Sequence, residues 1–174
     1  TVALDALVGV YTPVPGTGLT FVYTAHPVGG APQLSRESVA VQYFPPDAFP
    51  PRMMGASRGR VADALAGRRG VVRWQPFPLW VRTLLPPLLW LRKQRNRLQG
   101  HPEPPIVRRP VRAQGVLNGV DGAPVVEVAP EPGVLLWESL RRRARQEWGR
   151  PVQVVRLLDV QAKDDPVIVR FALA

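Results

Sequence analysis

The chain has 174 residues and a mass of 19.2 kDa, which excludes a large multidomain enzyme. It contains 21 proline and 15 glycine residues, so turns interrupt it too often for a coiled coil or a plain helical bundle. Because it has no cysteine, a disulfide scaffold, a thiolate zinc site and a cysteine nucleophile are excluded. This composition fits a reducing compartment, and we expect a cytoplasmic protein.

The formal net charge of +10 is concentrated in the middle of the chain. Residues 58–113 carry thirteen basic and two acidic side chains, whereas both flanks are close to neutral. Such an asymmetry indicates two folded regions joined by a basic connector. The chain is therefore divided into an N-terminal region 1–67, a basic connector 68–110 and a C-terminal region 111–174.

The N-terminal region predicts three strands followed by a helix. The strands are expected at 4–11, 19–26 and 38–44, where β-branched and aromatic residues alternate between Pro- and Gly-rich turns. The helix is expected at 58–65, which places apolar residues on one side. Since Thr1 opens directly into apolar strand material, we expect the chain to be a fragment with a further segment upstream.

The basic connector alternates Arg-rich stretches with apolar stretches that prolines interrupt, and it predicts one helix at 88–98. Its longest apolar stretch, 77–91, is too short to span a bilayer and is broken by Pro86 and Pro87. Its arginines and tryptophans suit nucleic acid, by phosphate neutralisation and base stacking, or an anionic membrane surface. We favour a solvated, Arg-rich linker over both partners, and the two prolines limit the amphipathic length that a membrane surface would need.

The C-terminal region predicts a hairpin, a helix and two strands. The expected strands are 112–118, 124–128, 152–160 and 167–173, and the expected helix is 137–148. Asp121-Gly122 marks the hairpin turn, while Gly149 and Pro151 mark the end of the helix.

In the C-terminal region, a helix between a hairpin and an apolar strand carries Glu138, Arg142, Gln146, Glu147 and Gly149. By these residues the C-terminal region resembles the front half of a Nudix hydrolase domain. The N-terminal region looks like the back half of the same domain, because the predicted strands, the run Leu34-Ser35-Arg36-Glu37 and the segment 41–50 follow one another as they do after a Nudix box. The resemblance implies an α+β protein with an incomplete Nudix-like αβα sandwich and a mixed sheet.

The helix departs from the family signature, in which Arg-Glu-apolar-x-Glu-Glu-x-Gly holds a divalent cation. With Gly149 as the anchor, Arg142 and Glu147 match, whereas Arg143 and Gln146 stand where the family has metal-binding glutamates. Glu147 is thus the candidate metal ligand and catalytic residue of a degenerate box, although ion pairing with a neighbouring arginine is its simpler role. The resemblance also carries over Glu37 as a candidate catalytic residue, against the simpler role of a solvated loop glutamate.

By resemblance, the parent protein is a metal-dependent pyrophosphatase that uses Mg²⁺ or Mn²⁺ to hydrolyse nucleoside-diphosphate-linked substrates. The present segment lacks a complete catalytic box. The alternative is a non-catalytic Nudix-like module that binds a nucleotide or a partner and has a regulatory role. Two arrangements explain why a back half precedes a front half: two tandem domains, each incomplete, or one permuted domain whose halves pack together.

Overall fold

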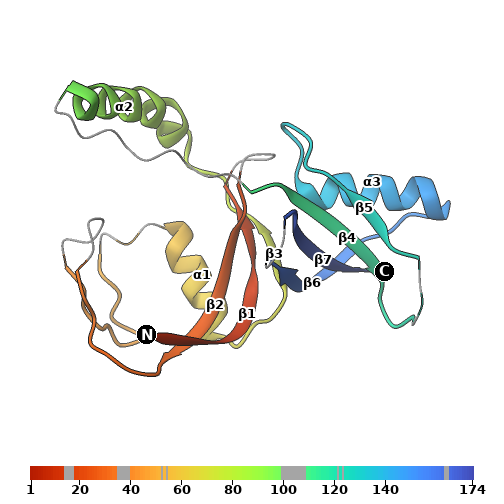
Figure 1. Ribbon diagram of the computed structural model, residues 1–174, viewed down its shortest axis with the longest axis horizontal. Coiled ribbons are helices and arrows are strands. Elements are labelled where there is room, and N and C mark those ends of the chain that lie inside the picture. The colour runs from red at the N-terminus through yellow and green to blue at the C-terminus, as the bar shows by residue number, and fades with distance from the viewer. Residues whose placement is uncertain are drawn as a thin grey trace.

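The computed structural model describes residues 1–13, 18–34, 40–51, 53, 55–98, 109–120, 122, 124–162 and 165–174. Over these ranges the chain is an α+β protein with two mixed sheets and three helices (Figure 1). The elements are β1 (Val2–Thr12), β2 (Thr20–Pro27), α1 (Gly55–Leu65), β3 (Val71–Trp74), α2 (Leu79–Leu98), β4 (Val111–Leu117), β5 (Val126–Val128), α3 (Leu136–Trp148), β6 (Val154–Gln161) and β7 (Val167–Leu173).

The first sheet has the strand order β2-β1-β3. Its central strand pairs antiparallel with β2 and parallel with β3. Val10 stands opposite Phe21 on one side and Val72 on the other, so these apolar side chains share one face of the sheet. Helix α1 lies over the other face, where the hydroxyl of Tyr11 donates a hydrogen bond to a side chain of the helix.

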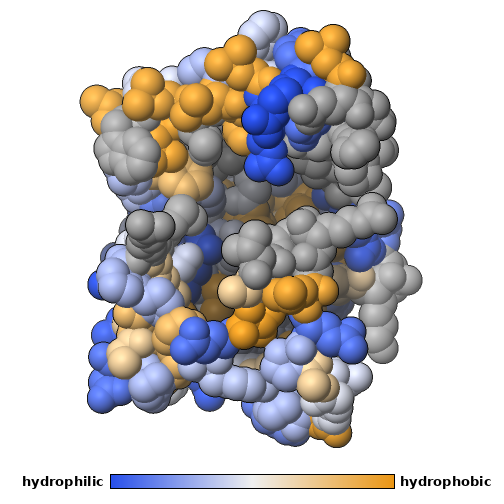
Figure 2. Space-filling model, turned by 90° about the vertical axis from the view of Figure 1, so that its left-hand side faces the viewer, coloured by the Kyte–Doolittle hydropathy of each residue, from blue (hydrophilic) through white to orange (hydrophobic). Residues whose placement is uncertain are grey.

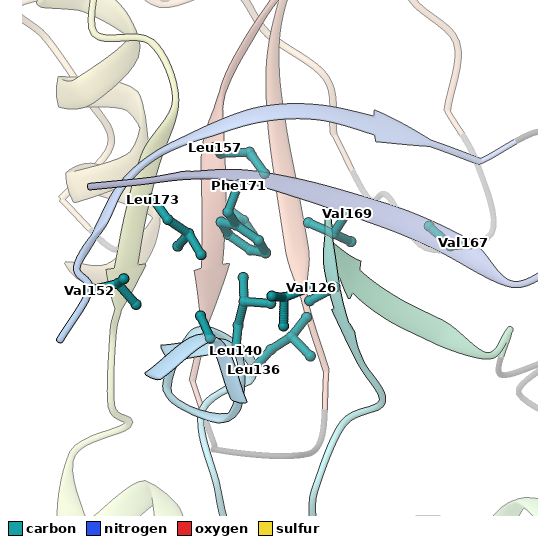
Figure 3. Packing of buried hydrophobic residues seen from close by; sticks show 12 residues of the cluster. Val126, Leu136, Leu140, Val152, Leu157, Val167, Val169, Phe171 and Leu173 are labelled. Carbon is teal, nitrogen blue, oxygen red and sulfur yellow. The ribbon is translucent and has the colours of Figure 1, made fainter. Parts of the chain in front are cut away.

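The second sheet has the strand order β5-β4-β7-β6. Strands β4 and β7 are parallel, while β5 and β6 are antiparallel to their neighbours. Parallel strands need a long connection, which β5, α3 and β6 provide. On β7, Val169, Phe171 and Leu173 are spaced two residues apart and share one face of the strand, and their side chains lie between the sheet and α3 (Figure 3).

One hydrophobic core contains residues of both terminal regions. Its buried members are Val10, Ala113, Val126, Leu136, Leu140, Ala144, Val152, Leu157, Val167, Val169, Phe171 and Leu173. The three members on α3 are spaced four residues apart and therefore line one side of the helix. Val10 comes from the first sheet, and Leu7, Phe21 and Val72 of that sheet pack against the same cluster. The N- and C-terminal regions therefore exclude water from a shared interior.

Gly70 lies where the edge strands β3 and β6 of the two sheets meet. The backbone N–H of Leu157 on β6 donates a hydrogen bond to the carbonyl oxygen of Gly70, with an N···O distance of 2.8 Å. Gly70 has φ +67°, and a Cβ at this position would lie 2.5 Å from the Leu157 carbonyl oxygen. Both the left-handed backbone and the close approach require glycine at this junction.

Most of the predicted elements are confirmed within a few residues, and three expectations about them are wrong. Residues 40–44, the described part of the expected strand 38–44, form no strand, and their large apolar side chains are exposed. The third strand of the first sheet is instead β3, which lies in the region expected to be a connector. Helix α2 continues through Pro86 and Pro87 and so begins at Leu79 rather than at residue 88. The φ of proline is compatible with a helix, and carbonyls that lose their partner on an exposed helix can bind water.

Candidate functional site

Helix α3 carries the positions that resemble a Nudix box. Leu136, Leu140 and Ala144 attach it to the core, which directs its arginines to the outer face. Gly149 ends the helix in the left-handed conformation at φ 65°, and its N–H donates to the carbonyl of Arg145 at 3.1 Å. The expected helix end at Gly149 is confirmed.

The carboxylate of Glu147 is bound by an arginine of its own helix. Arg143 Nε donates to Glu147 Oε1 at 2.6 Å, across one helical turn. Arg143 therefore neutralises Glu147, the candidate metal ligand of this helix. Both side chains are partly exposed to solvent, so this is an ordinary surface pair between residues four apart.

Two further carboxylates close to α3 are held in the same way. Arg141 Nη1 donates to Glu138 Oε1 at 2.8 Å, one turn from the start of the helix. Arg142 Nη1 donates to Glu131 Oε2 at 3.2 Å, which ties the preceding loop to the helix. The carboxylates of Glu131, Glu138 and Glu147 are thus paired with arginines and are not arranged around a shared cation.

The donor set on α3 does not fit Mg²⁺ or Mn²⁺. Hard divalent cations need several oxygen ligands, and among the described residues no group of three or more His, Cys, Asp or Glu side chains could hold a metal ion. Glu147 is the one carboxylate of its helical turn, which also contains Arg143 and Gln146. The guanidinium of Arg143 repels a cation. We therefore derive no metal-dependent step through this helix.

The other candidate catalytic residue, Glu37, lies outside the described residues, as does the run Ser35 to Val39 that surrounds it. His26, considered as a base at the end of a strand, lies on β2 opposite β1. Its Nδ1 is hydrogen-bonded to Asp5 Oδ1 in an exposed pair at the rim of the first sheet. Here His26 has the role of a satisfied polar residue.

A buried charge network, which we call the Asp63 network, lies between α1 and the first sheet. Asp63 is 2% exposed, and its carboxylate accepts from Tyr11 Oη at 2.9 Å and from Arg68 Nη1 at 2.9 Å. Arg73 on β3 adds an ion pair, with its Nη1 3.2 Å from Asp63 Oδ2. Two arginines from different elements thus converge on one carboxylate.

A third arginine completes the Asp63 network. The guanidinium carbon of Arg60 lies 5.6 Å from the centre of the Tyr11 ring, and its Nε donates to Gln75 Oε1 at 3.0 Å. Burial, with the hydrogen bond to Asp63 as a second cause, raises the pKa of Tyr11 from 10.0 to about 12, so the phenol stays neutral. The network therefore combines three cations with one anion.

The sequence gives weak signals for this network. Asp63 is the single acidic residue of α1, and Arg68 follows it by five residues, just beyond the end of the helix. The inward orientation of Asp63 could not be predicted locally, because its partner Tyr11 lies on β1, 52 residues away.

The arrangement suggests two chemistries for this chain. The Asp63 network offers guanidinium groups held side by side, with Arg68 and Arg73 each partly exposed, and this chemistry suits phosphate oxygens. Helix α3 offers a partly neutralised basic surface without a metal site. No helix in the described part of the chain combines the length and the apolar character needed to cross a bilayer. Comparison of the chain with protein-family models, with curated proteins and with solved structures finds no match.

Proposed function

We propose that this chain is a non-catalytic Nudix-like module that binds the phosphate groups of a nucleotide. The observation that carries the proposal is the 2.6 Å ion pair between Arg143 and Glu147. In a working Nudix box the two positions would supply carboxylates to one cation, but here the first position supplies the charge that occupies the second. The buried side of α3 packs in the core, whereas its exposed side has arginine–glutamate pairs in place of carboxylates that could bind a cation.

Phosphate binding is supported by the Asp63 network. One of its three arginine charges is balanced by Asp63, which leaves the cluster positive near the junction of α1 and β3. Arg68 and Arg73 are 56% and 39% exposed while one Nη of each contacts Asp63, so their remaining N–H groups can reach a ligand. A guanidinium already oriented by a carboxylate loses little conformational entropy when it binds a phosphate. The absence of cysteine supports the cytoplasm, where nucleotides are abundant, as the location.

Binding and turnover measured on the same protein test this function. We expect ADP without metal to raise the melting temperature of the chain, and no release of product from a dinucleotide or a nucleotide sugar with Mg²⁺ or Mn²⁺. Arg68→Lys keeps a charge beside Asp63 but removes the planar fork, and it should weaken ADP binding about tenfold. Arg58→Lys is the matched control, because Arg58 is an exposed arginine that contacts backbone carbonyls away from Asp63. Equal affinities in the two variants would refute the assignment of the ligand to the Asp63 network.

A second function is suggested by the N-terminal region, whose strands β1 and β2 correspond to two of the stretches on which the resemblance to a back half rests. It is metal-dependent hydrolysis of nucleoside-diphosphate-linked substrates by the parent protein, with Glu37 as the candidate carried over. Its carboxylate ligands have to come from elsewhere than α3. Turnover with Mg²⁺ that persists in Glu147→Gln would favour this function over the first, whereas turnover that disappears in this variant would contradict our account of α3.

A further inference from the structure

Helix α2 extends away from the two sheets and exposes apolar side chains along its length. In Figure 1, α2 lies near the top, apart from the elements that form the core. Figure 2 shows the same molecule turned about its vertical axis, and hydrophobic residues gather near the top, at the height of α2, with hydrophilic residues beside them. Leu84, Leu88 and Leu91 are 55%, 59% and 56% exposed. Their spacing of four and three residues places them on one side of the helix, and Trp90 is equally exposed. Exposed apolar residues that adjoin one another in this way mark an interaction surface.

The charge of α2 has one sign. Between Leu79 and Leu98 the sequence contains Arg82, Arg92, Lys93, Arg95 and Arg97 and no acidic residue. Arg95 follows Leu91 by four residues and so ends the leucine stripe. A long basic side chain at that place can bury its stem beside apolar groups while its charged end reaches outward. The partner of this helix should therefore be negatively charged and apolar beneath its charged layer.

We propose that α2 is a membrane-surface helix that binds anionic lipid, with its axis parallel to the bilayer. Twenty helical residues extend about 30 Å, which provides a long contact in the plane of the headgroups. The three leucines enter the boundary between headgroups and acyl chains, and the basic side chains pair with phosphate and carboxylate groups. Because the helix passes through Pro86 and Pro87 without interruption, the prolines do not divide this surface.

The observations favour lipid over the other occupants of such a surface. A nucleic acid would bind the basic groups but would leave Leu84, Leu88 and Leu91 in water. A second copy of the helix would cover the leucines but would bring two sets of five positive charges together. An anionic membrane satisfies both the apolar stripe and the charge.

The experiment is cosedimentation of the full chain with vesicles of phosphatidylcholine, with and without phosphatidylserine. We expect binding to the vesicles that contain phosphatidylserine, a decrease with added salt, and little binding to phosphatidylcholine alone. Leu88→Ser should weaken binding about tenfold, because a leucine no longer enters the apolar layer. Lys93→Gln should weaken it about fivefold.

Matched controls separate this surface from a general effect of charge or polarity. Leu34→Ser replaces a leucine that is 65% exposed outside α2, and Arg142→Gln removes an exposed charge on α3; both should leave vesicle binding unchanged. All four side chains are exposed, so the variants should melt at the temperature of the parent chain. The proposal is overturned if the chain ignores phosphatidylserine vesicles or binds them equally well with Leu88→Ser. It is also overturned if the helix instead binds duplex RNA, or forms a dimer that Leu88→Ser dissolves, without binding vesicles.

Discussion

Substitution of Gly70 by alanine probes the junction between the two sheets. Two costs arise: a left-handed backbone at φ +67°, about 1 kcal/mol for an alanine, and a Cβ placed 2.5 Å from the carbonyl oxygen of Leu157. The oxygen belongs to backbone that is hydrogen-bonded within the junction, so relief of the contact moves β3 relative to β6. Overpacking of this kind costs a further 1 to 3 kcal/mol, roughly. Gly70→Ala should therefore lower the free energy of unfolding by about 2 to 4 kcal/mol.

Gly67 provides the matched control. Its φ of +66° is nearly the same, but no atom lies within 4 Å of the position that a Cβ would occupy. Gly67→Ala should lose only the backbone cost, about 1 kcal/mol. Urea unfolding followed by circular dichroism gives the free energy of each variant from the midpoint and slope. Equal losses in the two variants would refute the contact at Leu157, and two separate transitions in the parent chain would refute the shared core.

Three further predictions concern the core and the ionisable groups. Leu140→Ala removes a fully buried side chain of α3 and should lower the free energy of unfolding by about 3 to 4 kcal/mol in the same urea experiment, whereas a loss below about 1 kcal/mol would contradict its place in the core. The pKa of Tyr11 is raised to about 12, so its contribution to stability is complete below pH 10. As the pH rises from 10 toward 12, this contribution is lost by at most about 1.4 kcal/mol per pH unit. Tyr11→Phe should flatten this alkaline decrease, and an unchanged slope would exclude Tyr11 as its source. Hydrogen bonds from Gln114 and Arg112 lower the pKa of Glu127 below 4.5, so its contribution is present above that pH and is lost as the pH falls through the lower value of the folded state; acid titration of Glu127→Gln should show a shallower decrease than the parent chain.

The helices and strands follow from local sequence where the pattern is strong. Strand β7 matches the prediction at both ends, and α3 begins one residue before its expected start, because β-branched alternation and the Gly149 stop are local signals. The expected strand at 38–44 fails over its described residues for a non-local reason. The edge of β1 that could accept a third strand is taken by β3, and that pairing depends on the close approach of Gly9 to Val71.

The candidate site was predictable only where it depends on helical spacing. The pairing of Glu147 with an arginine four residues away follows from the sequence, and this expectation is confirmed at Arg143. The Asp63 network was not predictable in this way, because its members come from β1, α1, β3 and the turn after α1. Only the assembled sheet places Tyr11 beneath the helix. The Nudix resemblance itself stays a prediction that the proposed binding and turnover experiments address.

The carboxylates of Asp63 and Glu147 should contribute very differently to the stability of the fold, because the first is buried and the second is partly exposed. An exposed ion pair four residues apart on a helix contributes a few tenths of a kcal/mol, so Glu147→Gln should change stability by less than about 0.5 kcal/mol. Asp63→Asn removes the buried carboxylate that accepts from Tyr11 and pairs with two partly exposed arginines, and it should cost about 1.5 to 3 kcal/mol. If urea unfolding gave similar losses for both, the Asp63 carboxylate would not be organising Arg68 and Arg73. Because an exposed pair of this kind contributes little to stability, the pairing of Glu147 with Arg143 bears on the chemistry of the helix alone, whereas Asp63 links the fold to the arginines that we assign to the ligand.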